Sequence, residues 1–251
     1  MSSSGWSAVA AASVCCMLAG SLAAQNVSRA PPTDFTGTWL PDARRAEPWP
    51  ASLPLAPDAR RFMDGFDPSE SDPTTYCMPF GTPRNMLQTE YPLEIVQTPQ
   101  RLVMVLQPNL ANAEVRRIRL DGGDLPTTPE PSWFGTSRGY WEGSTLVVET
   151  VGMREDAIVS ENGLPHSSEL RVVERLHITN DARRGKVLID DIELHDRLAY
   201  RAPLKTRRYY SWAPEAHPRD PTCIDATWSA RLWRERLHEH AEAARDTEGG
   251  Q

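Results

Sequence analysis

The chain has 251 residues, of which 39% are hydrophobic and 24% charged, and its formal net charge is -7. This composition is typical of a globular protein and excludes a disordered chain. The acidic balance, with no block of basic residues, argues against a nucleic acid or an anionic membrane surface as the partner.

Residues 1–24 have the pattern of an export signal. The apolar run over residues 8–20 is too short to span a bilayer, and small residues follow it. We expect cleavage near Ala23 or Ala24, which would give a periplasmic or secreted protein with no stable membrane insertion after signal removal. A buried N-terminal helix is the alternative, because no Lys or Arg precedes the apolar run.

Two cysteines, Cys77 and Cys223, remain after removal of this signal. An even pair in an oxidising compartment predicts a disulfide, worth roughly 4 kcal/mol in the chain-entropy model for so long a loop. Two free thiols are the alternative. The lack of a Cys-x-x-Cys motif argues against a zinc ribbon, and we expect neither a metal nor a cofactor.

Proline dominates the segment from residue 41 to residue 83, which contains nine prolines. Such a segment cannot be a central strand, because each proline removes a donor from the ladder. A short strand is expected at residues 35–39, and one helix is expected to begin at Pro57. We expect residues 25–90 to supply this strand and then to wrap the outside of the domain.

From Tyr91 onward the pattern changes to strands separated by turns. No amphipathic helix alternates with these strands, which excludes a βαβ architecture. Residues 91–224 therefore predict an all-β, antiparallel, closed barrel, and residues 225–251 predict a C-terminal helix packed on its wall. The expected strands after Tyr91 are 93–98, 101–107, 114–120, 138–143, 144–152, 169–178, 186–194 and 205–212.

Alternation along residues 169–178 places Glu174 on an apolar face that must point inward. An unpaired ionised carboxylate would be costly there, so Glu174 needs a partner or a raised pKa. Arg116 shares a face with apolar residues of its own strand and is the predicted partner. The pair could orient a ligand or could be a purely structural ion pair.

The strand at residues 187–195 can present either face to the interior. Asp190 shares one face with Leu188 and Ile192, which makes it a candidate ligand-binding residue. Acidic residues and His195 share the other face, where they could bind a cation. A solvated acidic edge is the alternative, because no EF-hand spacing is present.

His166 lies in a turn that leads directly into the strand of Glu174. A histidine at a barrel mouth can act as a general acid or base near neutral pH. A turn histidine bonded to backbone is the alternative. His166 and Glu174 are separated by eight residue steps, which would span about 26 Å if extended, so the two could act only at opposite depths of a cavity.

Four stretches, "YPLEIVQTP", "RRIRLDG", "SRGYWEGSTLVVETVG" and "GLPHSSELRVVERL", resemble a large, poorly characterised family of exported bacterial proteins. The resemblance covers Tyr91 to about Arg208 and implies a lipocalin-like, calycin-type barrel. Two positions depart from it, since Gly123 and Leu125 replace an arginine and a histidine of the family pattern. The candidate residues that follow the pattern are Arg116, Ser137, Trp141, His166, Glu174 and Tyr200.

These observations predict an exported barrel, monomeric or homodimeric, that acts on a mostly apolar, oxygenated small molecule. As a cofactor-independent lyase, isomerase or cyclase, it would use His166, Glu174 and Arg116 for catalysis. We expect Trp141, Ser137, Tyr200 and Asp190 to contact the ligand. A non-catalytic carrier of a hydrophobic molecule is the first alternative, and an envelope interaction protein is the second.

Overall fold

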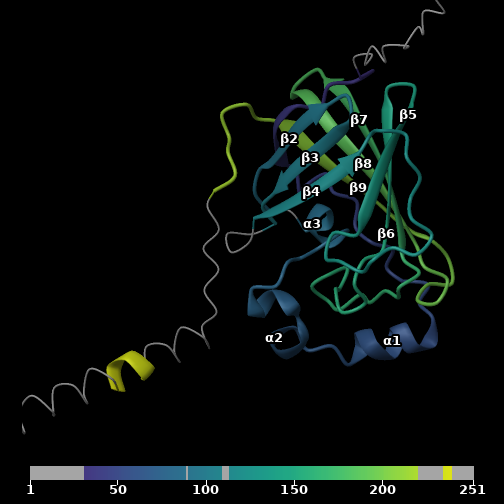
Figure 1. Cartoon of the computed structure of the whole chain (residues 1–251), viewed down its shortest axis with the longest axis vertical. Helices are drawn as coiled ribbons and strands as arrows, with labels where there is room; N and C mark the ends of the chain where they lie inside the picture. Colours follow the sequence, from purple (N-terminus) through teal and green to yellow (C-terminus); the bar gives the residue numbers. More distant parts are fainter. Residues whose placement is uncertain (1–30, 89, 109–112, 220–233, 239–251) are drawn as a thin grey trace, which may run out of the picture.

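The computed structural model describes residues 31–88, 90–108, 113–219 and 234–238. Nine strands in these residues close into one barrel, each pairing with the next and the last with the first (Figure 1). The predicted all-β barrel is therefore confirmed. The strands are β1 (Gly37–Pro41), β2 (Leu93–Thr98), β3 (Arg101–Leu106), β4 (Glu114–Arg119), β5 (Thr136–Glu142), β6 (Thr145–Val151), β7 (Arg171–Asp181), β8 (Gly185–His195) and β9 (Leu204–Trp212).

The barrel departs from a purely antiparallel arrangement at one place. Strands β4 and β5 run parallel, with Ile118 opposite Ser137, whereas the other neighbouring pairs are antiparallel. A parallel pair needs a connection that returns along the length of the strands. Residues 120–135 provide it, and their three prolines keep this connection out of the ladder.

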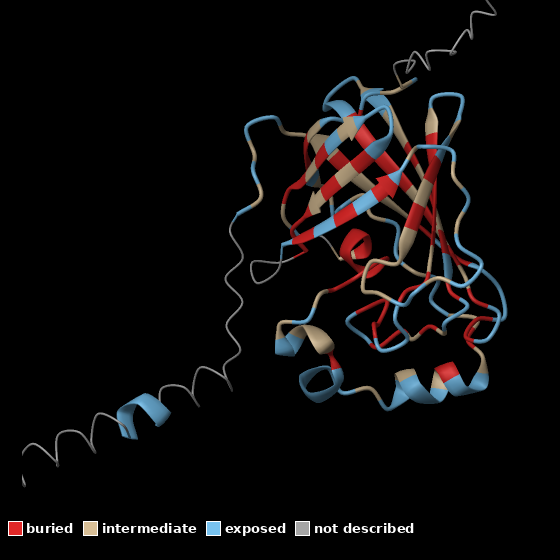
Figure 2. Cartoon of the chain, viewed as in Figure 1, coloured by how far each residue is buried: buried red, intermediate tan, exposed pale blue. Residues whose placement is uncertain are grey.

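The proline-rich segment covers one end of the barrel (Figure 1). It contains α1 (Pro57–Asp64), which confirms the predicted helix, followed by α2 (Pro68–Ser71), a 3-10 turn and α3 (Arg84–Leu87). All four residues of α3 are buried, and this helix closes the open barrel end (Figure 2). Beyond the last proline of the segment, Met86 and Leu87 of α3 join the barrel core.

Two long loops, residues 152–170 and 196–203, meet the proline-rich segment at this end of the barrel, which we call the base. Backbone hydrogen bonds join the 196–203 loop to the proline-rich segment, from Ala56 N to Ala199 O at 2.8 Å and from Arg201 N to Pro54 O at 2.7 Å, and Tyr200 Oη donates to Pro165 O of the 152–170 loop at 2.8 Å. The base is therefore a layer of loops and short helices hydrogen-bonded to itself beneath the barrel.

Strand alternation sets the inner face as the sequence predicted. Glu174 is 0% exposed, whereas Arg171 and Arg175 on the same strand face outward and reach solvent. On β8 the structure decides between the two possible faces, because Asp190 is buried in the interior with Leu188 and Ile192. The acidic residues of the other face of β8 point outward.

Several predictions fall wholly or partly outside the described residues. The signal at residues 1–24 lies outside them, as does Cys223, so the Cys77–Cys223 pairing stays a prediction although Cys77 is disulfide-bonded. In the predicted C-terminal helix, residues 234–238 are helical, and Leu237 is 62% exposed. Within the described ranges, no helix is long and apolar enough to cross a membrane.

Candidate functional site

The predicted pair of Arg116 and Glu174 forms inside the barrel. Arg116 Nη1 donates to Glu174 Oε1 at 2.7 Å, and Nη2 donates to Oε2 in a second parallel contact. Their side chains are 1% and 0% exposed. Nη2 also donates to Thr150 Oγ1 at 2.8 Å, and Ser137 Oγ lies 2.8 Å from the same Thr150 oxygen. The pair is thus held by protein groups on β4, β5, β6 and β7.

Asp190 lies in the same interior, and no group among the described residues forms a hydrogen bond with either of its carboxyl oxygens. Burial, and after it the charge of Glu174, raise the pKa of this carboxyl well above its usual range. The Nε of Arg116 is also without a partner among the described residues. Asp190 is therefore a buried acid that favours its protonated form, as desolvation requires.

Helix α3 seals the barrel end nearest these groups. Tyr210 Oη donates to the carbonyl oxygen of Met86 at 3.1 Å. Arg84 in turn forms a buried ion pair with Asp72, with 2.7 Å between Nη2 and Oδ2. The interior ion pair consequently lies behind a layer of protein, and its groups do not face solvent.

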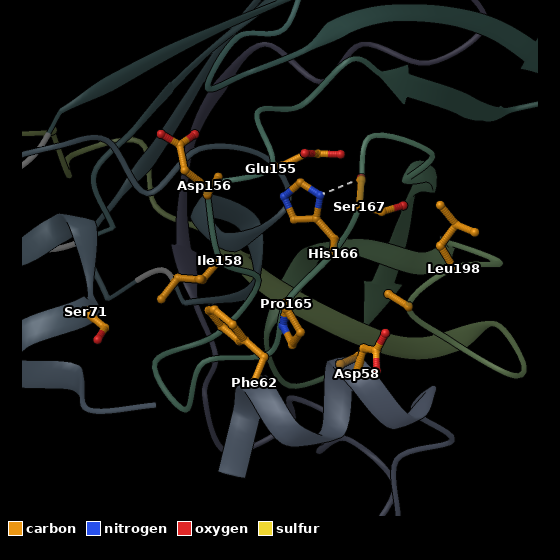
Figure 3. A pocket seen from close by; sticks show the side chains of 13 residues that line it. Asp58, Phe62, Ser71, Glu155, Asp156, Ile158, Pro165, His166, Ser167 and Leu198 are labelled. Atoms are coloured by element: carbon orange, nitrogen blue, oxygen red, sulfur yellow. Dashed lines mark hydrogen bonds between the residues drawn. The ribbon is translucent and has the colours of Figure 1, made fainter. Parts of the chain in front are cut away.

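His166 lies elsewhere, in the wall of a cavity of about 700 Å³ in the base (Figure 3). We call it the base cavity. Helix α1 and α2 form one side of it, and the loops 155–158, 165–167 and 198–199 form the other. The lining residues are Asp58, Ala59, Phe62, Ser71, Glu155, Asp156, Ala157, Ile158, Pro165, His166, Ser167, Leu198 and Ala199.

The ring of His166 is fixed by one hydrogen bond. Its Nδ1 lies 2.9 Å from the carbonyl oxygen of Ser167, and a carbonyl only accepts, so Nδ1 must carry the proton. Nε2 has no hydrogen-bond partner among the described residues. Burial lowers the pKa of the imidazole, which favours the neutral ring. Nε2 therefore presents a lone pair.

The turn that carries His166 is held by Asp196 and Tyr200. Asp196 accepts from the backbone N–H of Ser167 at 2.6 Å and from its hydroxyl at 2.9 Å. It also accepts from the backbone N–H of Leu198 and of Ala199, at 3.1 Å and 3.0 Å. One carboxylate thus ties together the two loops that line the cavity.

Tyr200 has a different role from the one predicted. Its hydroxyl donates to the carbonyl oxygen of Pro165 at 2.8 Å, and its side chain is 4% exposed. Tyr200 is not among the lining residues of the base cavity. It supports the turn of His166 from behind. Sequence reasoning missed Asp196, although an Asp followed by exposed turn residues is the usual signal of a side chain that caps backbone N–H groups.

The predicted site residues therefore lie in three places. Arg116, Glu174, Ser137 and Asp190 are together in the barrel interior, and His166 is in the base. Trp141 lies near the β5–β6 turn, where its ring stacks on Phe35 with 5.9 Å between centroids. The structure does not bring His166 to the ion pair, so the three predicted catalytic residues do not form one site.

The base cavity is acidic and mostly apolar. Its lining includes Asp58, Glu155 and Asp156 but no Lys or Arg. Two of these carboxylates are paired with arginines beside the cavity, Asp58 with Arg61 and Asp156 with Arg154. Glu155 accepts a hydrogen bond from the backbone N–H of Ser168 at 2.9 Å. Such a lining disfavours an anionic ligand.

No group of His, Cys, Asp or Glu side chains in the described ranges is arranged to hold a metal ion. The acidic outer face of β8 instead forms ion pairs with β9, including Glu193 with Lys205 at 2.9 Å. This agrees with a solvated acidic edge.

No protein-family model and no curated protein matches the chain. Among solved structures, the chain is similar to the crystal structure of a point mutant of the fluorescent protein UnaG. The TM-score is 0.35 at 14% sequence identity, and the match covers 72% of this chain and 97% of that chain. A similarity of this size assigns neither a ligand nor a site to this protein.

Proposed function

We propose that the protein binds a small, mostly apolar molecule in the base cavity and that Nε2 of His166 accepts a hydrogen bond from it. The observation that carries this proposal is the unpartnered Nε2 of a buried, neutral histidine in the wall of a cavity of about 700 Å³. Buried polar atoms are nearly always hydrogen-bonded in proteins. Nε2 has less than 1 Å² of accessible surface, so a ligand hydroxyl or N–H would satisfy it after a local movement of the cavity wall.

The size and lining of the cavity agree with such a ligand. Small-molecule sites usually measure about 300–1,000 Å³ and combine apolar walls with a few polar groups. At the rim, Phe62 is 50% and Leu198 is 58% exposed. Large apolar side chains left in solvent around a concave surface are typical of a binding site. An apolar molecule would cover both.

The charge of the cavity lining narrows the chemical class of the ligand further. The polar side chains in the lining are mainly hydrogen-bond acceptors, namely the carboxylates of Asp58, Glu155 and Asp156 and the neutral imidazole of His166. A carboxylate or phosphate would meet the like charge of Glu155 and no Lys or Arg in the lining, which costs free energy. The ligand class that fits is a neutral aryl or alkyl alcohol, a phenol or an amine.

Proton transfer by His166 is the second candidate function, and one specific observation favours it. The Nδ1–H of a catalytic base is commonly oriented by an acceptor, which leaves Nε2 free toward the substrate. Ser167 O provides that orientation at 2.9 Å. A lyase or isomerase would then use His166 alone, because Arg116 and Glu174 are bonded to each other inside the barrel.

Export and membership of the exported bacterial family are further proposals. They are supported by the apolar run at residues 8–20 and by the motifs between Tyr91 and Arg208. N-terminal sequencing of the mature protein from a periplasmic extract would test export, with cleavage after Ala23 or Ala24 as the expected result.

The binding proposal is tested by calorimetry with matched naphthalene derivatives. Naphthol should bind more tightly than naphthalene to the wild type, because only naphthol can donate to Nε2. His166→Phe keeps a ring of similar size but removes the acceptor, so it should lower the affinity for naphthol about tenfold, as the loss of one buried hydrogen bond does.

His177→Phe is the control, because the side chain of His177 is on the outward face of β7 and is 29% exposed. It should leave naphthol binding unchanged. Equal naphthol affinity in the wild type and His166→Phe would contradict the proposal. If a substrate is found, His166→Gln should lower its turnover by about a hundredfold to ten-thousandfold for the second candidate function.

A further inference from the structure

A second cavity of about 540 Å³ lies in the base, on the other side of the loop at residues 157–165. We call it the Arg208 cavity. Strand β9 contributes Arg208, and residues between 43 and 90 contribute seven of the other twelve. The lining residues are Ala43, Trp49, Phe80, Arg84, Leu87, Gln88, Glu90, Pro108, Val159, Ser160, Glu161, Asn162 and Arg208.

The guanidinium of Arg208 is bonded only to uncharged groups. Nε donates to Leu87 O at 3.0 Å, and Nη1 donates to Glu47 O at 2.9 Å and to Thr206 Oγ1 at 2.6 Å. A fourth bond joins Nη1 to Arg207 O at 3.1 Å. In the part of the chain that the structure describes, no carboxylate lies within ion-pair distance of Arg208, and Nη2 makes no hydrogen bond.

Among the described residues, no carboxylate forms an ion pair with the half-buried Arg208, although the charges of Asp190 and Glu47 act on it at longer range. Burial lowers its pKa, but a guanidinium stays protonated in proteins. Other buried arginines differ, since Arg116 has Glu174 and Arg84 has Asp72. Asp190 lies opposite Arg208 in the β8–β9 register, yet its carboxyl oxygens have no hydrogen-bond partner within the described ranges.

Aromatic surface lies in the same cavity. Arg84 covers the ring of Phe80, with 4.5 Å from its guanidinium carbon to the ring centroid. Trp49, which is partly buried against the core, also lines the cavity. A cavity lined by both a guanidinium without an ion-pair partner and an indole ring is suited to a planar anion, because the anion can neutralise the guanidinium while its ring packs on the aromatic surface.

We propose that the Arg208 cavity binds a small aromatic carboxylate, with the carboxylate on Nη2 of Arg208 and the ring against Trp49. Exposed Glu90 and Glu161 also line the cavity. Their charges weigh against a dianion such as a phosphate monoester and leave a monoanion as the better match for one guanidinium. This site is independent of the base cavity and selects the opposite ligand charge.

Calorimetry with naphthoate tests the proposal on the whole protein. We expect naphthoate to bind, and Arg208→Gln to weaken its binding at least tenfold while naphthol binding at the base cavity persists. Glu161→Gln should strengthen naphthoate binding a few fold by removing a like charge. Arg44→Gln, which changes an exposed arginine outside the lining, is the matched control and should have no effect.

If Arg208→Gln does not fold, nuclear magnetic resonance of the wild type titrated with naphthoate tests the same proposal. Naphthoate should shift the Nε–H resonance of Arg208 and the indole N–H resonance of Trp49. Unchanged resonances at saturating naphthoate would overturn the proposal. Equal naphthoate affinity in a folded Arg208→Gln protein would also overturn it, and so would binding lost equally in His166→Phe.

Discussion

Arg116 on β4 and Glu174 on β7 meet across the barrel interior in a two-bonded ion pair whose side chains are 1% and 0% exposed. Two strands, β5 and β6, separate β4 from β7 around the barrel wall. The pair therefore links two strands that are not neighbours, and Ser137 and Thr150 of the intervening strands accept further hydrogen bonds from Nη2 of Arg116. These contacts give the pair a structural role at the centre of the fold.

Removing one partner of this pair should lower the free energy of unfolding far more than replacing both partners. Glu174→Ala leaves the Arg116 charge buried and unpaired, which typically costs about 3–5 kcal/mol of the free energy of unfolding. Replacing both residues with leucine should recover much of that loss. Urea denaturation of the two single variants and the double variant measures the coupling, and additive losses would contradict a direct interaction.

Arg117 supplies the matched control for this experiment. It adjoins Arg116 in the sequence but lies on the exposed outer face of β4. Arg117→Ala should change the free energy of unfolding by no more than about 0.5 kcal/mol, as at ordinary surface positions.

Asp190 should make the protein less stable as the pH rises. Its folded pKa is raised by burial, so between the unfolded and folded pKa values the folded state holds more protons than the unfolded state. Linkage then requires the free energy of unfolding to fall with rising pH, by about 1.4 kcal/mol for each pH unit in that window. Asp190→Asn removes this group.

The comparison of Asp190→Asn with the wild type isolates the effect from other carboxylates. We expect the variant to be more stable than the wild type near pH 8, with the difference shrinking toward about pH 4, where the unfolded carboxyl also becomes protonated. Urea midpoints at several pH values measure this. A difference that does not vary with pH would show that Asp190 titrates normally.

The barrel was the part of the structure most open to prediction from sequence. The alternation along β7 places Glu174 inward and Arg171 outward without reference to any other strand, because a strand has a strict period of two. Pairing Glu174 with Arg116 required only that both lie on inner faces. The parallel pairing of β4 and β5 was missed, since it depends on the path of the loop at residues 120–135.

The base cavity could not be derived in the same way. Its walls come from α1, from the loop after β6 and from the loop after β8, and no periodic pattern relates these segments. Their meeting depends on the packing of the proline-rich segment under the barrel. His166 was identifiable as a candidate from its turn, but its neighbours Phe62, Glu155 and Leu198 were not.

Binding at the base cavity should follow the ionisation of His166. Burial lowers its pKa, so naphthol affinity should stay constant from about pH 8 to below about pH 6.5, the ordinary histidine pKa. It should fall only where the ring itself becomes protonated, because the imidazolium offers no acceptor. Calorimetry across this range checks the prediction, and a decline centred on the ordinary pKa would contradict it.

The same shift affects stability with a definite sign. Between the lowered folded pKa and about 6.5, only the unfolded chain is protonated at His166, so the free energy of unfolding should fall as the pH falls through this window. His166→Phe should lack this contribution. Equal pH dependence of the wild type and the variant over this window would show that burial does not perturb the imidazole.

Gly163 should control the shape of the base cavity. Its φ is +72°, and a Cβ there would lie 2.2 Å from Cγ of Phe66. Gly163→Ala should cost about 1–3 kcal/mol through backbone strain and steric conflict. It should also weaken naphthol binding several fold, because the displaced loop leads directly to His166. Hydrogen exchange should increase in residues 157–166.

Gly143 gives a control for backbone strain alone. Its φ is +64°, but a Cβ there would meet nothing within 4 Å. Gly143→Ala should lower stability by about 1 kcal/mol and leave naphthol binding unchanged. Loss of binding in both variants would mean that general destabilisation, and not the position of the 157–166 loop, governs the cavity.

The most direct test of ligand binding at His166 is the ¹⁵N spectrum of its ring with and without naphthol. The structure predicts a proton on Nδ1 and a lone pair on Nε2, because Nδ1 lies 2.9 Å from the Ser167 carbonyl oxygen. Naphthol at saturation should shift the Nε2 resonance upfield, as expected when an unprotonated ring nitrogen accepts a hydrogen bond. A proton found on Nε2, or an Nε2 resonance that naphthol leaves unchanged, would contradict the account.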